Sequence, residues 1–139
     1  ALEHQGGDAR LIAVTVLTSM QDTDVNELGM NLSAAHLATH LAGLAQKCGL
    51  DGVVCSAQEA HGIVNQYGDA FLRVTPGIRP ISLLSVDDQR RTMTPRQAID
   101  GDSSYLVIGR PVTQSKDPVA TLLAIKKEIG EDEGEGLTL

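Results

Sequence analysis

The chain has 139 residues, the size of one ordinary domain, and 42% of them are hydrophobic. Its formal net charge of −7 argues against a general nucleic-acid-binding protein, because phosphate contacts need surplus lysine and arginine. No apolar run approaches the roughly 20 residues that cross a bilayer, and no basic segment followed by an apolar one opens the sequence, so we expect neither a membrane span nor a signal peptide.

Apolar runs and amphipathic segments alternate along the chain. The first run, Leu11–Leu17, is continuous and rich in β-branched residues, which predicts a strand buried on both faces. After a polar stretch, Ser33 is a suitable N-cap for a helix that continues to about Cys48, with apolar residues along one stripe. Gly49 then takes the position after the helix, where a left-handed backbone is common.

Three more strand–helix pairs follow the first. Ser56–Glu59 and Thr94–Gln97 are capping boxes, in which the first side chain and the fourth satisfy each other's backbone amides at a helix start. Asp117 is expected to cap a last helix that ends near Gly130. The predicted strands cover residues 51–55, 71–75 and 105–108.

Four β/α units in succession predict an α/β fold with a parallel sheet and right-handed crossovers. Four such units form either a small open sheet or half of an eight-stranded barrel, and periodicity alone does not choose between them. We assign residues 1–130 to this domain. Residues 131–139 are acidic and contain glycine, which predicts a disordered tail.

The segment between Pro76 and Thr94 is a long loop at the end of a predicted strand. Such loops are often binding loops, although a solvated, variable loop is almost as good an interpretation. Ligands of parallel α/β folds bind beyond the carboxyl ends of the strands. Five of the eleven basic residues fall within a stretch of 32 residues that begins in this loop, a cluster that suits a small anionic ligand: Arg79, Arg90, Arg91, Arg96 and Arg110.

Two other strand ends carry candidate ligand groups. Gly109 permits a close backbone approach after the fourth strand, and Arg110 follows it at the start of a possible helical turn, a combination that suits phosphate. Barrels bind phosphate at the loops after strands 7 and 8. Thr18 and Ser19 end the first strand and are able to hydrogen-bond a carbonyl or amide edge, or simply the local backbone.

Metal or redox chemistry has weak support in the sequence. His36 and His40 have the spacing of a metal pair, but a solvated polar helix face explains them better. Cys48 and Cys55 form no C-x-x-C motif, and we expect both to be buried reduced thiols in a cytosolic protein. His61 has no evident partner, and no Ser-His-Asp arrangement is defensible. We therefore expect no metal site among these residues.

Taken together, several collinear segments resemble the bacterial orotidine 5'-phosphate decarboxylase family. The resemblance extends over nearly the whole chain except the acidic tail, and such long shared blocks are more specific than any single motif. The segments are 11–20 (LIAVTVLTSM), 47–60 (KCGLDGVVCSAQEA), 74–80 (VTPGIRP), 88–91 (DQRR), 93–95 (MTP) and 107–115 (VIGRPVTQS).

This resemblance implies a TIM, or (β/α)8, barrel, with the present chain as its second half, strands 5 to 8. The family converts orotidine 5'-phosphate (OMP) to uridine monophosphate (UMP) and carbon dioxide, the last step of de novo pyrimidine synthesis. It uses neither metal nor organic cofactor and works as a homodimer. The implied partners are therefore OMP and UMP, with no nucleic acid and no membrane, in the cytoplasm.

Binding roles carry over residue by residue. The resemblance implies that Thr18 contacts the pyrimidine ring, and that Arg79 and Gln89 belong to the phosphate-gripping loop, with Gln89 also near the ring. Gly109 would offer its backbone N–H, and Arg110 its guanidinium, to the 5'-phosphate. The segment 81–86 departs from the family by being more apolar than the usual glycine-containing loop.

The family's catalytic Asp-x-Lys-x-x-Asp segment does not occur in this sequence. We therefore expect no catalytic residue in this chain and no decarboxylation by the chain alone. Two alternatives remain. One is a half-barrel that binds nucleotides or serves as a scaffold without catalysis, and the other is a related phosphosugar barrel enzyme. An in-frame upstream Asp-x-Lys-x-x-Asp segment would favour the decarboxylase.

Overall fold

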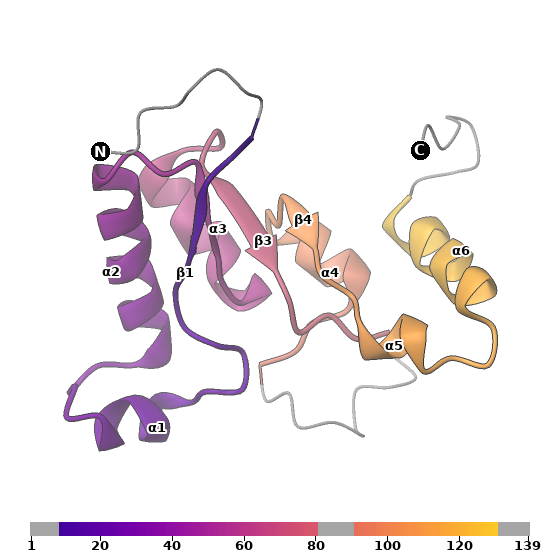
Figure 1. The fold of residues 1–139 in the computed structure, drawn as a ribbon, viewed down its shortest axis with the longest axis horizontal. Helices are drawn as coiled ribbons and strands as arrows, with labels where there is room; N and C mark the ends of the chain where they lie inside the picture. The colour runs from indigo at the N-terminus through magenta and orange to yellow at the C-terminus, as the bar shows by residue number, and fades with distance from the viewer. Residues whose placement is uncertain (1–8, 81–90, 131–139) are drawn as a thin grey trace.

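A computed structural model describes residues 9–80 and 91–130 of the chain. Four parallel strands form one sheet in the order β1-β2-β3-β4, so each strand pairs with the next in sequence (Figure 1). This arrangement confirms the predicted succession of parallel β/α units. The strands are shorter than the apolar runs that predicted them: β1 Ile12–Val14, β2 Gly52–Val54, β3 Leu72–Thr75 and β4 Tyr105–Leu106.

The helices begin where the capping signals predicted. The Ser33 hydroxyl accepts the His36 N–H, and both capping boxes, at Ser56 and Thr94, are formed. The Asp117 carboxylate accepts the Ala120 N–H at the start of the last helix. The helices are α1 Asp22–Glu27, α2 Ala34–Lys47, α3 Ala57–Tyr67, α4 Pro95–Asp100, α5 Arg110–Thr113 and α6 Pro118–Ile129.

Helix α1 was not predicted, because its sequence reads as a polar stretch. Gln21 and Asp24 form a capping box at its start, and the Asp22 carboxylate accepts the Ala34 N–H at 2.7 Å, which joins α1 to the start of α2. Val25 is fully buried in a cluster with Val16 and residues of α2. A six-residue helix with one buried side chain does not produce a helical hydrophobic periodicity that can be recognised in the sequence.

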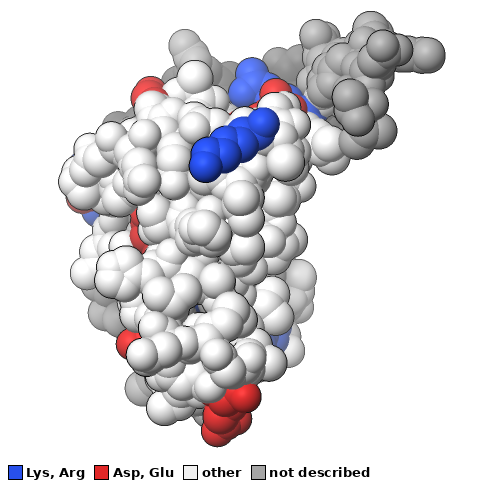
Figure 2. All heavy atoms as spheres, turned by 90° about the vertical axis from the view of Figure 1, so that its left-hand side faces the viewer, with Lys and Arg blue, Asp and Glu red and all other residues white. Residues whose placement is uncertain are grey.

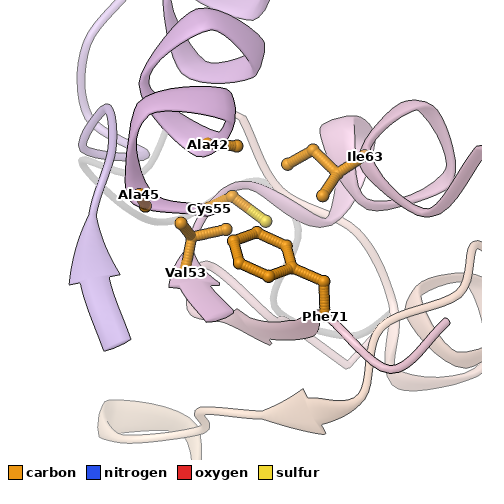
Figure 3. Packing of buried hydrophobic residues seen from close by; sticks show 6 residues of the cluster. All are labelled: Ala42, Ala45, Val53, Cys55, Ile63 and Phe71. Atoms are coloured by element: carbon orange, nitrogen blue, oxygen red, sulfur yellow. The ribbon is translucent and has the colours of Figure 1, made fainter. Parts of the chain in front are cut away.

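The main core lies between the sheet and helices α2 and α3. Figure 3 shows side chains from both helices meeting those of β2 around the Phe71 ring. The Tyr67 ring lies edge-on to Phe71 with centroids 6.0 Å apart, and the Tyr67 hydroxyl donates to the Thr39 carbonyl at 3.0 Å. The cluster consists of Ala42, Ala45, Val53, Cys55, Ile63 and Phe71.

The opposite face of the sheet is apolar but only partly covered by the described residues. Register places Val14, Val54, Val74 and Tyr105 in one row across the four strands. Val14 is 60% exposed and Tyr105 is 57% exposed. The prediction that the first strand is buried on both faces was therefore wrong for Val14, because nothing among the described residues covers this side of it.

The two cysteines differ in their exposure to solvent. Cys55 is buried as predicted, whereas the prediction of a buried Cys48 was wrong: it caps the end of α2 and is exposed. Figure 2 views the side on which α2 lies, where charged side chains are few. Within residues 9–80 and 91–130, no helix is long and apolar enough to traverse a lipid bilayer.

Candidate functional site

The carboxyl ends of the parallel strands lie along one edge of the sheet, and the candidate binding residues follow those ends. Thr18 comes after β1, Arg79 after β3, and Arg110 after β4. Thr18 and Arg79 are each 6% exposed, whereas Arg110 is exposed to solvent. This placement follows from the parallel order of the strands, because every β/α connection then leaves from the same edge.

Arg79 and Arg110 line one cavity of about 810 Å³. Arg79 Nη1 donates to its neighbour's carbonyl, that of Ile78, at 2.9 Å, which orients the guanidinium. Lys116 adds a third positive charge to the lining. Helices α5 and α6 and the connection between them supply most of the remaining wall: Pro111, Gln114, Ser115, Asp117, Ala120, Thr121, Ala124, Ile125 and Glu128, with Pro80 beside Arg79.

Both carboxylates in the cavity wall are engaged with backbone amides. Asp117 Oδ1 accepts the Ala120 N–H at 3.0 Å, and Glu128 Oε1 accepts the Arg96 N–H at 3.2 Å. These hydrogen bonds satisfy part of their negative charge locally. The arrangement therefore leaves a cavity with three cationic side chains, which is suited to a small anion such as a phosphate monoester.

Gly109 is the residue before α5, and the predicted helical turn begins at Arg110. Apart from Gly109 itself and its two chain neighbours, no atom of the described residues lies within 4 Å of the position that a Cβ at Gly109 would take. The backbone at Gly109 therefore has room for the close approach of a ligand. Pro111 follows at the second helical position, where its missing N–H costs no hydrogen bond.

Thr18 lies beside the chain that leads to Arg79 but is not part of the cavity wall. A Cβ added to Gly77 would lie 3.3 Å from Thr18 Cγ2, so this glycine allows the two segments to pack closely. Gly77 also has a φ of +79°, a backbone region that other residues rarely adopt. Gln89, the remaining predicted binding residue, lies outside the described residues.

A buried ion pair lies next to these residues, and sequence reasoning did not find it. Arg91 Nη1 donates to Glu59 Oε1, and the Glu59 side chain is only 2% exposed. Burial raises the pKa of the Glu59 carboxyl above its ordinary value, and the opposing effects of Arg91 and the Ser56 N–H are smaller. The sequence indicates Glu59 only as part of a capping box, a local pattern that does not reveal a partner 32 residues away.

The remaining candidate groups have structural partners. His61, for which the sequence indicated none, lies at the surface with its Nδ1 atom 2.6 Å from Asp102 Oδ2. His36 Nδ1 lies 3.0 Å from the Ser33 hydroxyl at the start of α2. Throughout the part of the chain that the structure describes, no group of three or more His, Cys, Asp or Glu side chains is placed to hold a metal ion. Burial raises the pKa of the Cys55 thiol to about 12.

Residues 1–125 match the sequence model of the orotidine 5'-phosphate decarboxylase / HUMPS family. The chain belongs to this family. It is 58% identical over 130 residues to orotidine 5'-phosphate decarboxylase of Escherichia coli (strain K12 / DH10B), covering 93% of this chain and 53% of the relative. The Klebsiella pneumoniae (strain 342) protein of the same name is 57% identical over 122 residues, which are 88% of this chain and 49% of the relative.

Solved structures agree with the sequence relatives. Orotidine 5'-phosphate decarboxylase from Lactobacillus acidophilus superposes with a TM-score of 0.71 at 41% identity, covering 91% of this chain and 52% of that one. The chain thus spans about half the length of the relatives it matches. The resemblance that the sequence motifs predicted is confirmed at the level of the family.

The same comparisons correct the predicted fold class. They assign the match to the N-terminal half of the relatives, so the prediction of the second half of a TIM barrel, strands 5 to 8, was wrong, as was the corresponding label for residues 1–130. The physical reason is that all β/α units share one pattern of apolar strand, cap and amphipathic helix. Periodicity therefore establishes a succession of units without numbering them.

Proposed function

We propose that this chain is part of an orotidine 5'-phosphate decarboxylase and binds the 5'-phosphate of a pyrimidine ribonucleotide, OMP or UMP. One observation carries the proposal: Arg79 and Arg110, which follow different strands, line the same cavity. Two guanidinium groups around one cavity match the charge and oxygen geometry of a phosphate monoester. Membership of the orotidine 5'-phosphate decarboxylase family indicates that a pyrimidine ribonucleoside is attached to this phosphate.

In this proposal each binding residue has a separate task. Arg110 and Arg79 hold the phosphate oxygens with charged hydrogen bonds, and the open backbone at Gly109 adds an N–H donor. Thr18 contacts the pyrimidine ring from the end of β1. Gln89 lies outside the described residues. On the basis of the family resemblance, we propose that it contacts both the phosphate and the pyrimidine ring.

Catalysis needs more than these contacts. Loss of carbon dioxide leaves a carbanion at C6 of the pyrimidine, which requires preorganised positive charge and a proton donor. Contacts with the distant phosphate help only by positioning the ring and adding binding energy in the transition state. Because the sequence contains no Asp-x-Lys-x-x-Asp segment, we propose that this polypeptide alone does not decarboxylate OMP.

The partly covered face of the sheet supports a larger assembly around the four units. Parallel sheets are ordinarily covered on both faces, yet Val14 and Tyr105 are more than half exposed in a continuous apolar row. We propose that this row belongs to the interior of a (β/α)8 barrel in the intact enzyme, a cytoplasmic homodimer that needs no metal or organic cofactor.

Binding is tested by titrating the chain with UMP and with uridine in a calorimeter. We expect UMP to bind more tightly than uridine, and Arg110→Gln to weaken UMP binding by about tenfold or more, because a charged hydrogen bond contributes about 1.5–3 kcal/mol. Lys47→Gln on α2 removes one positive charge away from the cavity and serves as the matched control. Equal UMP affinity in Arg110→Gln and Lys47→Gln would contradict the proposal.

Turnover is tested separately with purified chain and OMP, following the loss of substrate absorbance. We expect no activity above that of a mock purification from the same host, because the chain lacks the lysine that the family uses as proton donor. Activity that copurifies with the chain and disappears in Arg110→Gln would show that other residues supply the proton.

The alternatives remain distinct in these assays. A nucleotide-binding or scaffold half-barrel is favoured by the absence of the Asp-x-Lys-x-x-Asp segment and predicts UMP binding that no added partner polypeptide converts into turnover. A phosphosugar enzyme predicts that ribose 5-phosphate binds at least as tightly as UMP. Preference for UMP over ribose 5-phosphate favours the decarboxylase, since only UMP offers a ring to Thr18.

A further inference from the structure

The ion pair between Glu59 and Arg91 joins three parts of the molecule that surround Thr18. The Glu59 carboxylate accepts the Ser56 N–H at 2.9 Å in the first turn of α3 and a hydrogen bond from Arg91. Arg91 Nη2 donates to the Leu17 carbonyl at 3.0 Å, at the exit of β1. A second, longer hydrogen bond of 3.4 Å reaches the carbonyl of Val16.

The backbone of Arg91 contacts the same place. Its N–H donates to the Thr18 carbonyl at 3.3 Å. Its carbonyl oxygen would lie 3.1 Å from a Cβ added to Gly77, and Thr18 Cγ2 would lie 3.3 Å from that Cβ. Two residues further along, the Arg79 N–H donates to the Met93 carbonyl at 2.9 Å. The segment that begins at Arg91 therefore lies between the Thr18 turn and the start of the chain that carries Arg79.

Stability alone does not account for such a pair. Removing two charged groups from water is costly, and an apolar pair of similar volume is often at least as stabilising. The Glu59 side chain is 2% exposed and the Arg91 side chain 11%, so the cost applies to both. An apolar pair cannot donate hydrogen bonds to the two consecutive carbonyls before Thr18. A guanidinium can, because its planar group donates along several fixed directions at once.

We propose that the Glu59–Arg91 ion pair is a positioning device that holds the Thr18 turn in register with Arg79. Glu59 fixes the guanidinium against α3, and the guanidinium fixes the Val16 and Leu17 carbonyls. Neither residue is assigned to the ligand, so both act through Thr18. The consequence for binding rests on the proposed function: a displaced Thr18 weakens recognition of the pyrimidine ring while the arginines still hold the phosphate.

The positioning itself is tested without any ligand. Arg91→Lys keeps the positive charge but loses the planar guanidinium that donates several hydrogen bonds. Glu59→Gln keeps the shape of the side chain but loses its negative charge. We expect each to shift or broaden the Thr18 methyl resonance, assigned by its loss in Thr18→Ser, while the Ile63 methyl resonances stay in place. An unchanged Thr18 methyl in both variants overturns the proposal, and so does loss of the folded spectrum in both, which would make the pair purely structural.

Matched controls come from another arginine–carboxylate pair. Arg96 and Asp100 form an exposed ion pair of 2.9 Å on α4, separated by one helical turn. Arg96→Lys and Asp100→Asn make the same chemical changes as the two test variants. We expect neither to alter the Thr18 methyl resonance, and a shift as large as that in Arg91→Lys would show that the response is not specific to the buried pair.

The functional consequence is read from two ligands. In Arg91→Lys and Glu59→Gln we expect UMP affinity to fall about tenfold, a change of about 1.4 kcal/mol, with ribose 5-phosphate affinity within about twofold of the unmodified chain. Equal losses for both ligands overturn the assignment to Thr18. If the unmodified chain binds neither ligand, the proposed function fails, and the methyl spectra still decide whether the ion pair positions Thr18.

Discussion

A Cβ atom added to Gly52 would lie 2.4 Å from the carbonyl oxygen of Leu72 on the adjacent strand. The obstruction is backbone and cannot rotate away. We expect Gly52→Ala to lower the free energy of unfolding by about 1–3 kcal/mol through strand displacement. On the exposed side of α3, a Cβ at Gly62 would meet no described atom within 4 Å beyond its chain neighbours and the backbone of its own helix. Gly62→Ala should therefore raise the free energy of unfolding by about 0.5–1 kcal/mol.

Urea denaturation of the two glycine variants beside the unmodified chain measures both effects. The two changes add the same methyl group, so their opposite signs isolate the close approach of β2 and β3. A neutral Gly52→Ala would mean that the strands separate without cost at this position.

Ile63 is the buried contribution of α3 to the main core (Figure 3). Truncation leaves a cavity between two helices and the sheet, so Ile63→Ala should lower the free energy of unfolding by about 2–5 kcal/mol. Leu28→Ala removes a similar volume from a side chain that is 65% exposed and should change it by less than about 0.5 kcal/mol. Thermal or urea denaturation distinguishes them, and similar losses in both variants would argue against this core.

The two cysteines should differ sharply in reactivity. Burial raises the pKa of the Cys55 thiol to about 12, so at pH 8 only roughly one Cys55 thiol in 10,000 is ionised, and the thiolate is the form that reacts. Cys48 is exposed. Mass spectrometry during iodoacetamide treatment should show rapid addition at Cys48 and addition at Cys55 only after denaturation. Comparable rates in the folded chain would contradict the burial of Cys55.

Glu59 should make stability depend on pH in a direction set by burial. Burial raises its pKa above the ordinary value of 4.5. Between the unfolded and folded pKa values, the folded chain therefore binds more protons at this site than the unfolded chain. The contribution of Glu59 to the free energy of unfolding is therefore greatest below pH 4.5, and it is lost as the pH rises through the folded pKa. Glu59→Gln removes this titration.

The quantity to measure is the free energy of unfolding of the unmodified chain minus that of Glu59→Gln, followed from pH 4 upward by urea denaturation. We expect this difference to fall as the pH rises. An increase would mean that attraction by Arg91 outweighs burial and that the folded pKa lies below 4.5. Asp100→Asn, at an exposed carboxylate, controls for general charge effects.

Local patterns predicted the parts of the fold whose causes are local. Ser33, Ser56 and Thr94 cap helices as predicted because a cap depends on residues within four positions of it. Helix α1 was missed because its stability depends on a single buried residue, Val25, and on a contact with the start of α2. The order of the units within a barrel was assigned wrongly because each unit repeats the same pattern.

The sequence by itself determined the succession of parallel β/α units, the helix starts and the family, because strand hydrophobicity, caps and collinear motifs are written in neighbouring residues. Only the tertiary structure showed that Arg79 and Arg110 line one cavity, that Glu59 pairs with Arg91 and that Cys48 is exposed. Those facts depend on how distant segments approach one another at the carboxyl ends of the strands, and no local pattern encodes that distance.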